Sequence, residues 1–434
     1  MLLKGGVPLE IIGIDIGTTS ICGVVLEAES GKLLRSKTIA GNAFIESKMP
    51  FEKIQSPEKI LGIAKGILEE LLSDRCASIG VTGQMHGILY LNQAGKAVSP
   101  LYTWQDQRGE EPYGESTYAK HLGSHGGYGN VTDFYNRENG LVPKEAVSYC
   151  TIHDYLVMDL CGLKEPLIHT TDAASFGLFD LETQSFSYPC PAKVTGDHQI
   201  AGYYKGIPVG VAIGDNQASV LSTLSGKGDL LINVGTGSQV SMVHDKPIFG
   251  PDIEARPFFE DQYLIVGAAL CGGRAFSLLK SFYQQLLGYV IDLPEEKIYE
   301  LMNQMQKEAP KEGLIVDPRF AGSRRDPALR GSISGISTEN FTPAALTQGM
   351  LRGMVEELHE MVRQMNLPIK GIIGSGNGVR KNPAFAALCE ETFGAKLKIP
   401  AHLEEAAFGA ALFGAICAGH FKNAAEAQKT IRYL

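Results

Sequence analysis

Two stretches of the sequence repeat one pattern, IIGIDIGTTS at residues 11–20 and LLINVGTGSQ at residues 230–239. In each, an apolar run typical of a buried strand ends near a polar residue, Asp15 or Asn233, and a glycine-containing turn follows. The stretches lie about half of the 434-residue chain apart. A chain of this length is too long for one core, so we expect two or three domains, and the repeat predicts that two of them share a fold.

The elements predicted after each stretch follow the same order. In the first half, the pattern predicts an antiparallel meander of three strands at residues 9–17, 18–30 and 31–41. A helix at 56–72 and a buried strand at 77–84 follow. In the second half, it predicts strands at 228–237, 238–245, 263–270 and 369–376, and helices at 272–287 and 342–365. One glycine-broken strand arises readily by chance in α/β proteins, but two in register near the midpoint favour a duplicated α/β domain.

The duplicated pattern resembles the actin-like (ribonuclease H-like) ATPase folds, in which two such α/β domains close on a nucleotide. The resemblance implies a ligand cleft between the domains. We expect the first domain at residues 1–207 and the second at 208–434, because turn residues at 204–208 precede a new buried strand.

Composition narrows the class of protein. The formal net charge is −9, the pI is near 5.7, and no dense Lys/Arg run occurs, so the sequence favours neither a nucleic-acid partner nor an anionic membrane surface. The eight cysteines lie far apart without a C-x-x-C pair, which fits reduced thiols in a cytoplasmic protein. Residues 1–10 lack the apolar core of a signal peptide, and the apolar run at 406–419 is too short to span a bilayer; its small residues predict a tightly packed internal helix.

The two glycine turns suit phosphate binding. Glycine lets backbone N–H groups converge on an anion, and neighbouring hydroxyls add donors. The residues concerned are Gly17, Thr18 and Thr19 in the first turn and Gly235, Thr236 and Gly237 in the second. Neither turn has the Gly-Lys-Ser/Thr ending of a P-loop, and a plain hairpin turn is the alternative for each.

The difference between Asp15 and Asn233 predicts a division of roles between the two turns. Mg²⁺ takes one or two carboxylates and keeps several waters, so Asp15 could hold a hydrated Mg²⁺ beside the phosphates. The neutral Asn233 lets the second turn approach the same phosphates without adding negative charge.

A candidate general base lies between the two halves. Residues 210–224, GVAIGDNQASVLSTL, predict a buried strand leading into a helix whose first residue is Asp215. A carboxylate there is by default a helix N-cap. Phosphoryl transfer depends mainly on positioning and electrostatics, so a carboxylate of ordinary pKa suffices as the base that accepts a hydroxyl proton.

Further polar groups cluster in loops. Gln84, His86, Gln105 and Asp106 follow predicted strands in the first half, where α/β sheets usually contact ligands, and such a set suits a polyol. His86 could equally be a structural histidine, and Trp104 could pack rather than stack on a sugar. In the second half, Gly374, Gly376 and Gly378 permit a flat base to lie on the backbone, and Asn377 and Asn382 offer polar contacts, although Asn382 could simply cap a helix.

Eight motifs in order resemble the FGGY carbohydrate kinases over essentially the whole chain: IDIGTTS, GVTGQMHG, TWQDQRG, GDNQAS, INVGTGSQ, FAGSRRDPALRGSISGIS, GSGNGVRKNP and EEAAFGAALFGA. The resemblance implies transfer of the γ-phosphoryl of ATP, with Mg²⁺, to a primary hydroxyl of an open-chain sugar bound with the nucleotide between the domains. It implies Asp215 as the catalytic base and Asp15 as the metal ligand. For nucleotide binding it implies Gly17, Thr18, Thr19, Gly235, Thr236, Gly237, Gly376, Asn377 and Asn382. For sugar binding it implies Gln84, Met85, His86, Asp106, Asp215 and Asn216.

The motifs indicate the family more specifically than they indicate which sugar the protein phosphorylates. TGQMHG is similar to both the xylulose and the sedoheptulose subfamilies, whereas TWQD, GGYGN and TIHDYLVMDLCGL resemble the latter. Two features depart from the family: a Lys-x-x-Trp element has no clear equivalent, and NVGTGSQ follows the general family form. The expected function is therefore a ketose kinase, acting on sedoheptulose or else on xylulose or another polyol. An actin-like ATPase or a sugar-binding regulator is the alternative of another class, and a homodimer is a family-level expectation.

Overall fold

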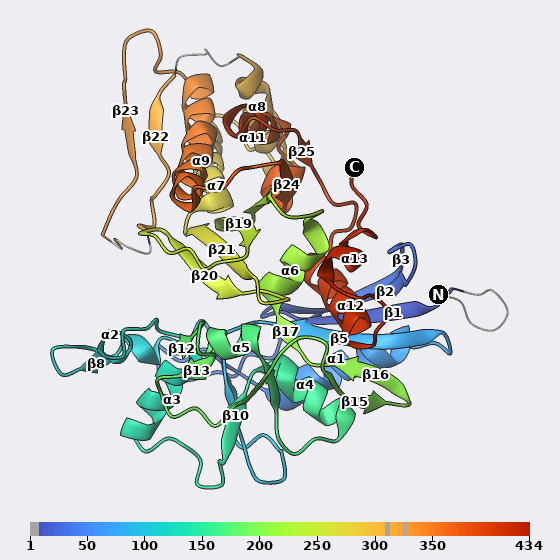
Figure 1. The fold of residues 1–434 in the computed structure, drawn as a ribbon. Coiled ribbons are helices and arrows are strands. Elements are labelled where there is room, and N and C mark those ends of the chain that lie inside the picture. Colours follow the sequence, from blue (N-terminus) through green and yellow to red (C-terminus); the bar gives the residue numbers. More distant parts are fainter. Residues whose placement is uncertain (1–7, 309–312, 324–325, 327) are drawn as a thin grey trace. The chain divides into compact units, whose positions relative to one another are not determined.

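The computed structural model describes residues 8–308, 313–323, 326 and 328–434, and the chain forms two compact units (Figure 1). Unit 1 comprises residues 1–223, 257–261 and 402–432, and unit 2 comprises residues 224–256, 262–401 and 433–434. Three residues of the FAGSRRDP motif, at 324, 325 and 327, lie outside the described residues.

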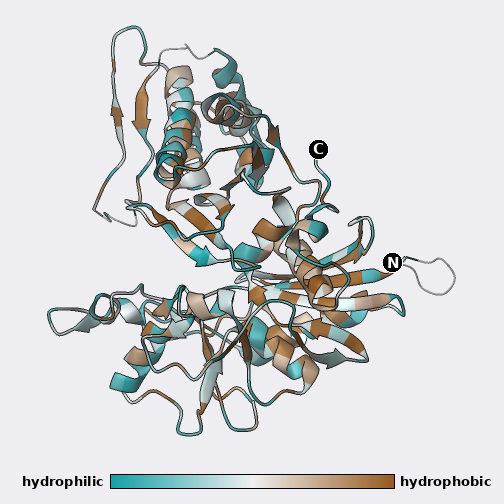
Figure 2. Cartoon of the chain, in the orientation of Figure 1, coloured by the Kyte–Doolittle hydropathy of each residue, from teal (hydrophilic) through white to brown (hydrophobic). Residues whose placement is uncertain are grey.

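Unit 1 is built on a mixed sheet of order β15-β16-β5-β1-β2-β3, with β17 also pairing with β5. β1 runs antiparallel to β2 and parallel to β5, so the predicted meander is confirmed. Figure 2 shows hydrophobic residues gathered along the strands of this sheet. The strands of the unit are β1 Glu10–Ile16, β2 Ser20–Glu27, β3 Leu33–Ala40, β4 Ile54–Gln55, β5 Cys76–Gly83, β6 Leu89–Leu91, β7 Leu101–Tyr102, β8 Pro112–Tyr113, β9 Ser116–Thr117, β10 Ser148–Cys150, β11 Leu167–His169, β12 Phe179–Asp180, β13 Ser185–Phe186, β14 Lys193–Thr195, β15 Ile200–Tyr204, β16 Ile207–Gly210 and β17 Ile213–Gly214.

Several helices of unit 1, among them α1, α4 and α12, pack on this sheet. The predicted helix at 56–72 is α1, with Pro57 at its first position and Ser56 accepting the Lys59 N–H as N-cap. The helices of the unit are α1 Pro57–Leu71, the 3₁₀ turn η1 Arg108–Glu110, α2 Tyr118–His121, α3 Gly129–Glu138, α4 Ile152–Cys161, α5 Thr170–Ser175, α6 Asp215–Thr223, α12 Glu405–Cys417 and α13 Ala424–Gln428.

Helix α12 confirms the internal helix predicted from the small residues at 406–419. Its residues from Ala407 to Cys417 are buried, and it packs against β1, β5 and α6. A Cβ on Gly80 would lie 1.7 Å from the Ala410 carbonyl oxygen, and one on Gly409 would lie 1.8 Å from the Ala218 carbonyl oxygen. Only glycine permits these backbone approaches, so the glycines set how closely α12 docks.

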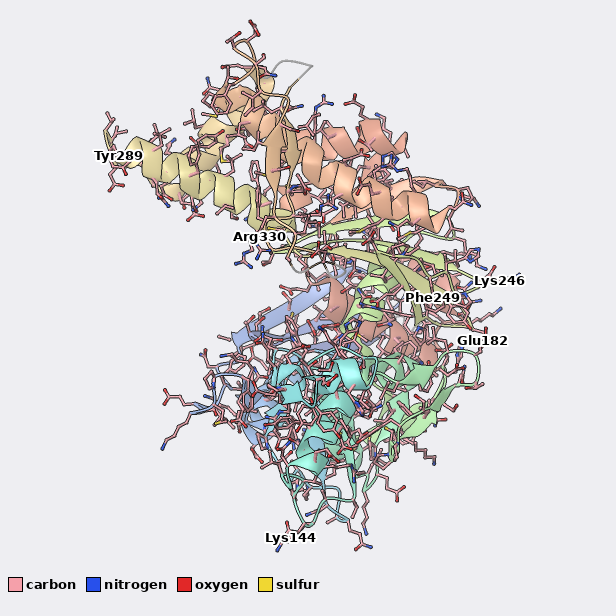
Figure 3. All side chains as sticks on the ribbon, turned by 90° about the vertical axis from the view of Figure 1, so that its left-hand side faces the viewer. Lys144, Glu182, Lys246, Phe249, Tyr289 and Arg330 are labelled. Atoms are coloured by element: carbon pink, nitrogen blue, oxygen red, sulfur yellow. The ribbon has the colours of Figure 1, made fainter. Side chains whose placement is uncertain are left out.

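Unit 2 repeats the central arrangement of unit 1. Its sheet has the order β20-β21-β19-β18-β24-β25, and β18 is antiparallel to β19 and parallel to β24, as β1 is to β2 and β5. The long helix α9 packs on β19 and β21 and is flanked by α7, α8 and α11 (Figure 1). The elements of the unit are β18 Asp229–Val234, β19 Ser238–His244, β20 Ile253–Pro257, β21 Tyr263–Ala269, β22 Ile315–Asp317, β23 Ser332–Ser334, β24 Gly371–Ser375, β25 Leu397–Lys398, α7 Gly272–Gly288, α8 Glu295–Glu308, α9 Pro343–Met365, α10 Asn377–Arg380 and α11 Pro383–Phe393. Helix α7 ends beside Tyr289, which is labelled at the edge of the unit in Figure 3.

The compact units differ from the division expected at 207 and 208. Residues 204–208 lie in the hairpin that joins β15 to β16 within one sheet, and its turn is formed by Lys205 and Gly206, both at positive φ. The chain stays in unit 1 through α6, because β17 pairs with β5 and α6 packs on α12. The segment 402–432 belongs to unit 1 for the same reason, although it follows unit 2 in the sequence.

All eight cysteines are free thiols, as expected. In the part of the chain that the structure describes, every helix falls short of the length and apolar character needed to cross a membrane.

Candidate active site

The sheet of unit 1 brings two predicted carboxylates to one edge. β1, β5 and β17 are parallel, with β5 in the middle, so Asp15 near the end of β1 and Asp215 directly after β17 share the carboxyl edge. Two strand spacings, about 10 Å, separate the backbones of the outer strands. The Thr82 hydroxyl donates to the Ile213 carbonyl at 2.6 Å and ties β17 to β5. This edge is where α/β sheets usually bind ligands.

Asp15 is a carboxylate in an unfavourable environment. Its Oδ1 atom is buried and has no hydrogen-bond partner among the described residues. Burial raises its pKa well above the ordinary 3.8, and the negative charges of Asp215 and Glu404 raise it further. A divalent cation would relieve both the missing bond and the repulsion, so the residues present fit the expected metal.

Glu404 is a residue of this edge that the sequence analysis did not single out. It is the N-cap residue of α12, and its charge acts on Asp15. The signal was available, because the EE pair of the EEAAFG motif directly precedes a buried small-residue helix. The sequence does not show that Glu404 acts on Asp15, because the two residues are far apart in the chain.

The first glycine turn is tied to the predicted sugar loops by a chain of hydrogen bonds. The Trp104 indole N–H donates to the Thr18 hydroxyl at 3.0 Å, and that hydroxyl donates to Gln84 Oε1 at 3.2 Å. Gln84 donates to Gln55 at 2.9 Å, and Gln55 donates to the Thr18 carbonyl at 2.9 Å. Trp104 therefore neither packs in the core nor lies free, and it is 48% exposed.

Three of the predicted sugar-facing residues are buried and bound by the protein itself. Gln84 lies in the network above, and the Met85 side chain packs where a Cβ on Gly214 would fall. Asp106 accepts hydrogen bonds from the Lys53 N–H at 3.0 Å and from the Arg108 guanidinium at 2.7 Å. These contacts stabilise the loops, which is the structural alternative to direct sugar contact.

His86 differs from these three, because it is only half-buried and its backbone is strained. Its φ of 72° lies in the left-handed region, which non-glycine residues rarely adopt. The ring stacks on Tyr128 with 4.2 Å between centroids and an interplanar angle of 4°. Nδ1 donates to the Ser175 carbonyl at 2.8 Å, so Nε2 is left as the acceptor in the neutral ring.

Asp215 begins helix α6, as predicted, with Asn216 following, and both are half-buried. A buried cluster of His153, Asp154 and Asp172 lies near it, and His153 Nε2 and Asp172 Oδ1 are 3.0 Å apart. Burial lowers the pKa of His153 and raises the pKa of Asp172, and the charge of Asp215 raises both. The sequence gives no sign of this cluster, because His153 and Asp154 lie in α4 and Asp172 lies in α5, and only folding brings these helices together.

Unit 2 contains a pocket of about 1060 Å³ that gathers most of the predicted nucleotide residues of that unit. Gly235, Thr236, Gly376, Asn377 and Asn382 all line it. Its walls combine apolar, aromatic and charged groups, including Phe276, Tyr299, Leu351, Phe385, Arg274 and Lys381. A volume of this size with mixed walls suits a ligand as large as a nucleotide.

The second glycine turn rests on the N-terminus of α7. The Gly273 N–H donates to the Gly235 carbonyl at 3.0 Å, and the Arg274 N–H donates to the Thr236 carbonyl at 2.9 Å. A Cβ on Gly272 would lie 2.5 Å from the Ser238 nitrogen, so glycine is required there. The start of α7 therefore holds the second turn in shape, and the GGR sequence at residues 272–274 is the signal for it that the sequence analysis did not use.

The glycine-rich loop after β24 serves close backbone packing as well as the pocket. Gly376 has φ 77°, and a Cβ on it would lie 2.4 Å from the Val234 carbonyl oxygen. Asn382 caps α11 by accepting the Phe385 N–H at 3.1 Å, which is the capping role weighed as its alternative, and it also lines the pocket. Gly374 packs against Val379 and Leu397 and does not line the pocket.

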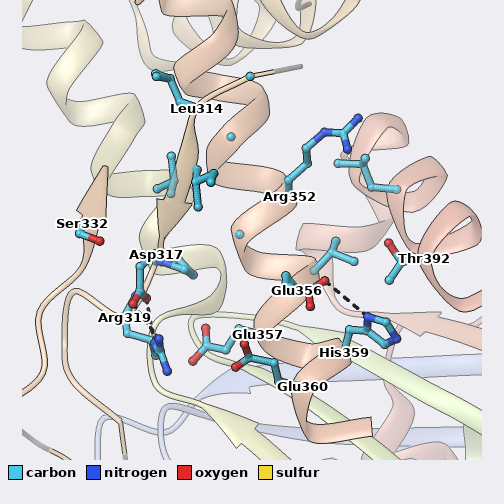
Figure 4. Close-up of a pocket in the computed structure, with 18 of the residues that line it drawn as sticks. Leu314, Asp317, Arg319, Ser332, Arg352, Glu356, Glu357, His359, Glu360 and Thr392 are labelled. Carbon is cyan, nitrogen blue, oxygen red and sulfur yellow. Dashed lines mark hydrogen bonds and ion pairs between the residues drawn. The ribbon is translucent and has the colours of Figure 1, made fainter. Parts of the chain in front are cut away.

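A second pocket of about 800 Å³ in unit 2 contains none of the predicted residues (Figure 4). It lies between α9 and the β22 strand, where Asp317 pairs with Arg319 at 2.7 Å. Burial, opposed by the charge of Arg319 and aided by nearby acidic groups, raises the pKa of Glu357 in its wall to about 7.

Comparison with known proteins identifies the family. Residues 10–117 match the N-terminal domain of the FGGY family of carbohydrate kinases, and residues 230–418 match its C-terminal domain. The chain is 31% identical to "Sedoheptulokinase" from Mus musculus, covering 92% of this chain and 96% of that protein. The chain belongs to the FGGY family of carbohydrate kinases. It is thus a phosphotransferase of the family that uses ATP and a sugar.

Other relatives of this kinase carry other substrate names. It is 24% identical to "Xylulose kinase" from Staphylococcus xylosus, covering 94% of this chain and 90% of that protein. Among solved structures, the xylulose kinase of Rhodospirillum rubrum aligns with a TM-score of 0.84 at 20% identity, covering 98% of this chain and 93% of that one. This structural likeness confirms the two-domain α/β fold expected from the sequence.

Proposed function

We propose that this kinase transfers the γ-phosphoryl of ATP to a primary hydroxyl of a ketose, and that the ketose is sedoheptulose. The observation that carries the substrate is the similarity to "Sedoheptulokinase" over nearly the full length of both chains. The alternative substrate is xylulose, because "Xylulose kinase" proteins match over a similar share of the chain at lower identity.

Asp215 is the proposed general base. Its position directly after β17, at the carboxyl edge of the sheet, supports this role. As the acceptor hydroxyl attacks the γ-phosphorus, its proton passes to the Asp215 carboxylate while the bond from phosphorus to the leaving oxygen of ADP breaks. Asn216 offers an amide beside the base for a neighbouring sugar hydroxyl.

His86 is the proposed sugar contact among the first-unit loops. Its half-buried ring stacks on Tyr128, and its backbone holds a strained left-handed conformation of the kind that gathers at ligand sites, which supports this role. Gln84, Met85 and Asp106 are proposed to hold the sugar loops in place, which accounts for their burial and protein contacts.

The proposed adenosine and phosphate contacts in unit 2 are those of its larger pocket. Gly376, Asn377 and Asn382 would lie against the adenosine, and Gly235, Thr236 and Gly237 would bind phosphate in a turn that the N–H groups of Gly273 and Arg274 hold in place. Gly17, Thr18 and Thr19 are the proposed phosphate contacts of unit 1. Asp15 would hold Mg²⁺, which when bound neutralises charge on the phosphates.

The base assignment is tested with Asp215→Asn. We expect kcat to fall by about 10²- to 10⁴-fold, because a positioned base typically contributes that factor. The Kd for ATP should stay within about threefold of wild type, because the base acts on the acceptor hydroxyl. The matched control is Asp74→Asn, at an exposed aspartate before β5, which should retain full activity. Near-normal turnover by Asp215→Asn would refute the role.

The substrate is tested by ADP release with ATP, Mg²⁺ and a panel of sedoheptulose, xylulose, ribulose, glycerol and no sugar. The highest kcat/KM with sedoheptulose is expected. A higher value with xylulose or ribulose would replace the substrate but keep the kinase. ATP hydrolysis indifferent to every sugar would instead favour the actin-like ATPase, and no turnover with retained sugar binding would favour the regulator. A homodimer and a cytoplasmic location stay predictions.

A further inference from the structure

A chain of buried hydrogen bonds ends at the backbone of Gly214, the residue before the proposed base. The Gly214 N–H donates to the Thr171 hydroxyl at 3.1 Å. That hydroxyl lies 2.9 Å from His169 Nδ1, and His169 Nε2 lies 2.9 Å from Asp197 Oδ1. Thr171 and His169 are fully buried.

The direction of every bond in the chain is determined. The Thr171 backbone N–H also points at His169 Nδ1, at 3.2 Å, and since an N–H can only donate, Nδ1 is the acceptor. The ring proton is therefore on Nε2 and is donated to Asp197. The Thr171 hydroxyl directs its proton at Nδ1 and keeps its lone pairs for the Gly214 N–H.

The far end of the chain is anchored in other segments of unit 1. Asp197 Oδ2 accepts the Glu260 N–H, and Glu260 Oε1 accepts the Ala424 N–H at 2.7 Å. Although burial opposes it, the hydrogen bonds from the His169 ring and from the Glu260 N–H hold the pKa of Asp197 below its ordinary value. An ionised Asp197 accepts from both neighbours at once, which keeps His169 in the Nε2–H form.

We propose that Thr171, His169 and Asp197 are positioning residues that fix Gly214 and so aim the carboxylate of Asp215 at the acceptor hydroxyl. This inference rests on the proposed role of Asp215. None of the three residues touches the reacting atoms in the proposed mechanism; they act through the backbone.

The backbone at Gly214 needs such support because β17 is short. It consists of Ile213 and Gly214 only, and a Cβ on Gly214 would meet the Met85 side chain at 2.6 Å. A displacement of about 1 Å at a reacting group can cost about 10²-fold in rate, so fixing this point matters for transfer.

The test compares Thr171→Val with Thr171→Ser in the full-length enzyme. Valine keeps the shape but removes the hydroxyl, whereas serine keeps the hydroxyl. We expect Thr171→Val to lower kcat by about 10- to 100-fold with an unchanged KM for ATP, and Thr171→Ser to stay within about threefold of wild type. Equal kcat in Thr171→Val and wild type, or equal losses in both variants, would overturn the inference.

A second variant keeps the inference testable if Thr171→Val does not fold. Asp197→Asn presents an amide that cannot accept from both His169 and Glu260, so it favours the Nδ1–H tautomer, which conflicts with the Thr171 N–H. We expect a fall in kcat together with a change of the His169 ring ¹⁵N shifts from the Nε2–H pattern. Wild-type enzyme with the Nδ1–H pattern would refute the chain.

The Asp215→Asn variant separates the two proposals in the same assay. If Asp215→Asn is inactive and Thr171→Val is fully active, only the positioning role fails. If Asp215→Asn is fully active, the base assignment itself fails, and the positioning inference falls with it.

Discussion

Gly409 in α12 allows a helix contact that supports the start of α6. A Cβ at Gly409 would lie 1.8 Å from the Ala218 carbonyl oxygen, and real Cβ atoms essentially never approach a heavy atom within 3.0 Å. Gly409→Ala therefore requires α12 and α6 to separate by more than about 1 Å, because the obstacle is backbone and cannot rotate away. Ala218 lies in the first turn of α6, which begins at Asp215.

The expected magnitude follows from two opposing terms. Alanine gains about 1 kcal/mol over glycine in a helix, while overpacking costs about 1–3 kcal/mol and more when rigid backbone is pushed. We expect a net loss of about 2 kcal/mol in unfolding free energy, or about 4–8 °C in the Tm of this unit. Displacement of Asp215 should lower kcat as well.

Gly62→Ala is the matched control, measured beside Gly409→Ala by calorimetry and ADP release. Gly62 is exposed in the middle of α1, and a Cβ there meets nothing within 4 Å. The helix gain is the same in both variants, so Gly62→Ala should raise the Tm by about 2–4 °C. If Gly409→Ala raised the Tm as much as Gly62→Ala, the close docking of α12 on α6 would be refuted.

Two further predictions concern unit 2. Glu357 is 8% exposed and its pKa is raised from 4.5 to about 7, so its ionisation opposes folding. As pH rises from about 4.5 to about 7, the unfolding free energy should fall by up to about 3 kcal/mol more in wild type than in Glu357→Gln, as measured by urea titrations at both ends. A fall of equal size in both proteins would contradict the assignment. Gly376→Ala combines a positive φ with a clash against Val234, whereas Gly394→Ala has φ 66° and open space; ATP titration should therefore show weaker binding for the first variant and wild-type binding for the second. Equal affinity in the two variants would remove Gly376 from the nucleotide site.

Local patterns predicted the central strands of both sheets, β1, β2, β3 and β5 in unit 1 and β18, β19, β21 and β24 in unit 2, but not the outer strands β15, β20 and β25. The alternation in residues 9–41 and the proline and serine before α1 act within a few residues, so the sequence carries them directly. The return of residues 402–432 to unit 1 depends on which surface the small residues of α12 meet, and that surface is formed by β1, β5 and α6. A run of small residues predicts that a helix packs closely, but it does not show which strands or helices it packs against.

The candidate site shows the same limit. Glycine turns and Asp215 are visible as motifs, whereas the roles of buried side chains depend on distant partners. The local sequence indicates a polar loop residue at Asp106, but the N–H of Lys53, which is distant in the sequence, donates to its carboxylate together with the neighbouring Arg108. The chain from Thr171 to Asp197 joins α5, the loop after β14 and residue 260, so no spacing rule could find it.

The structure gives a physical reason for the Asp and Asn at matching places in the two repeats. Asn233 faces Ser375 on the parallel strand β24, and its amide donates to the Ser375 hydroxyl at 2.6 Å. Asp15 faces Thr82 on the parallel strand β5, but Thr82 donates to Ile213 instead, and Asp15 Oδ1 has no hydrogen-bond partner in the described part of the chain. A buried polar group left unpaired costs about 1–3 kcal/mol. One repeat thus satisfies this position within its own sheet, while the other retains an unfavourable carboxylate. That cost supports the proposed role of Asp15 as a ligand of Mg²⁺, because a bound cation would supply the missing partner.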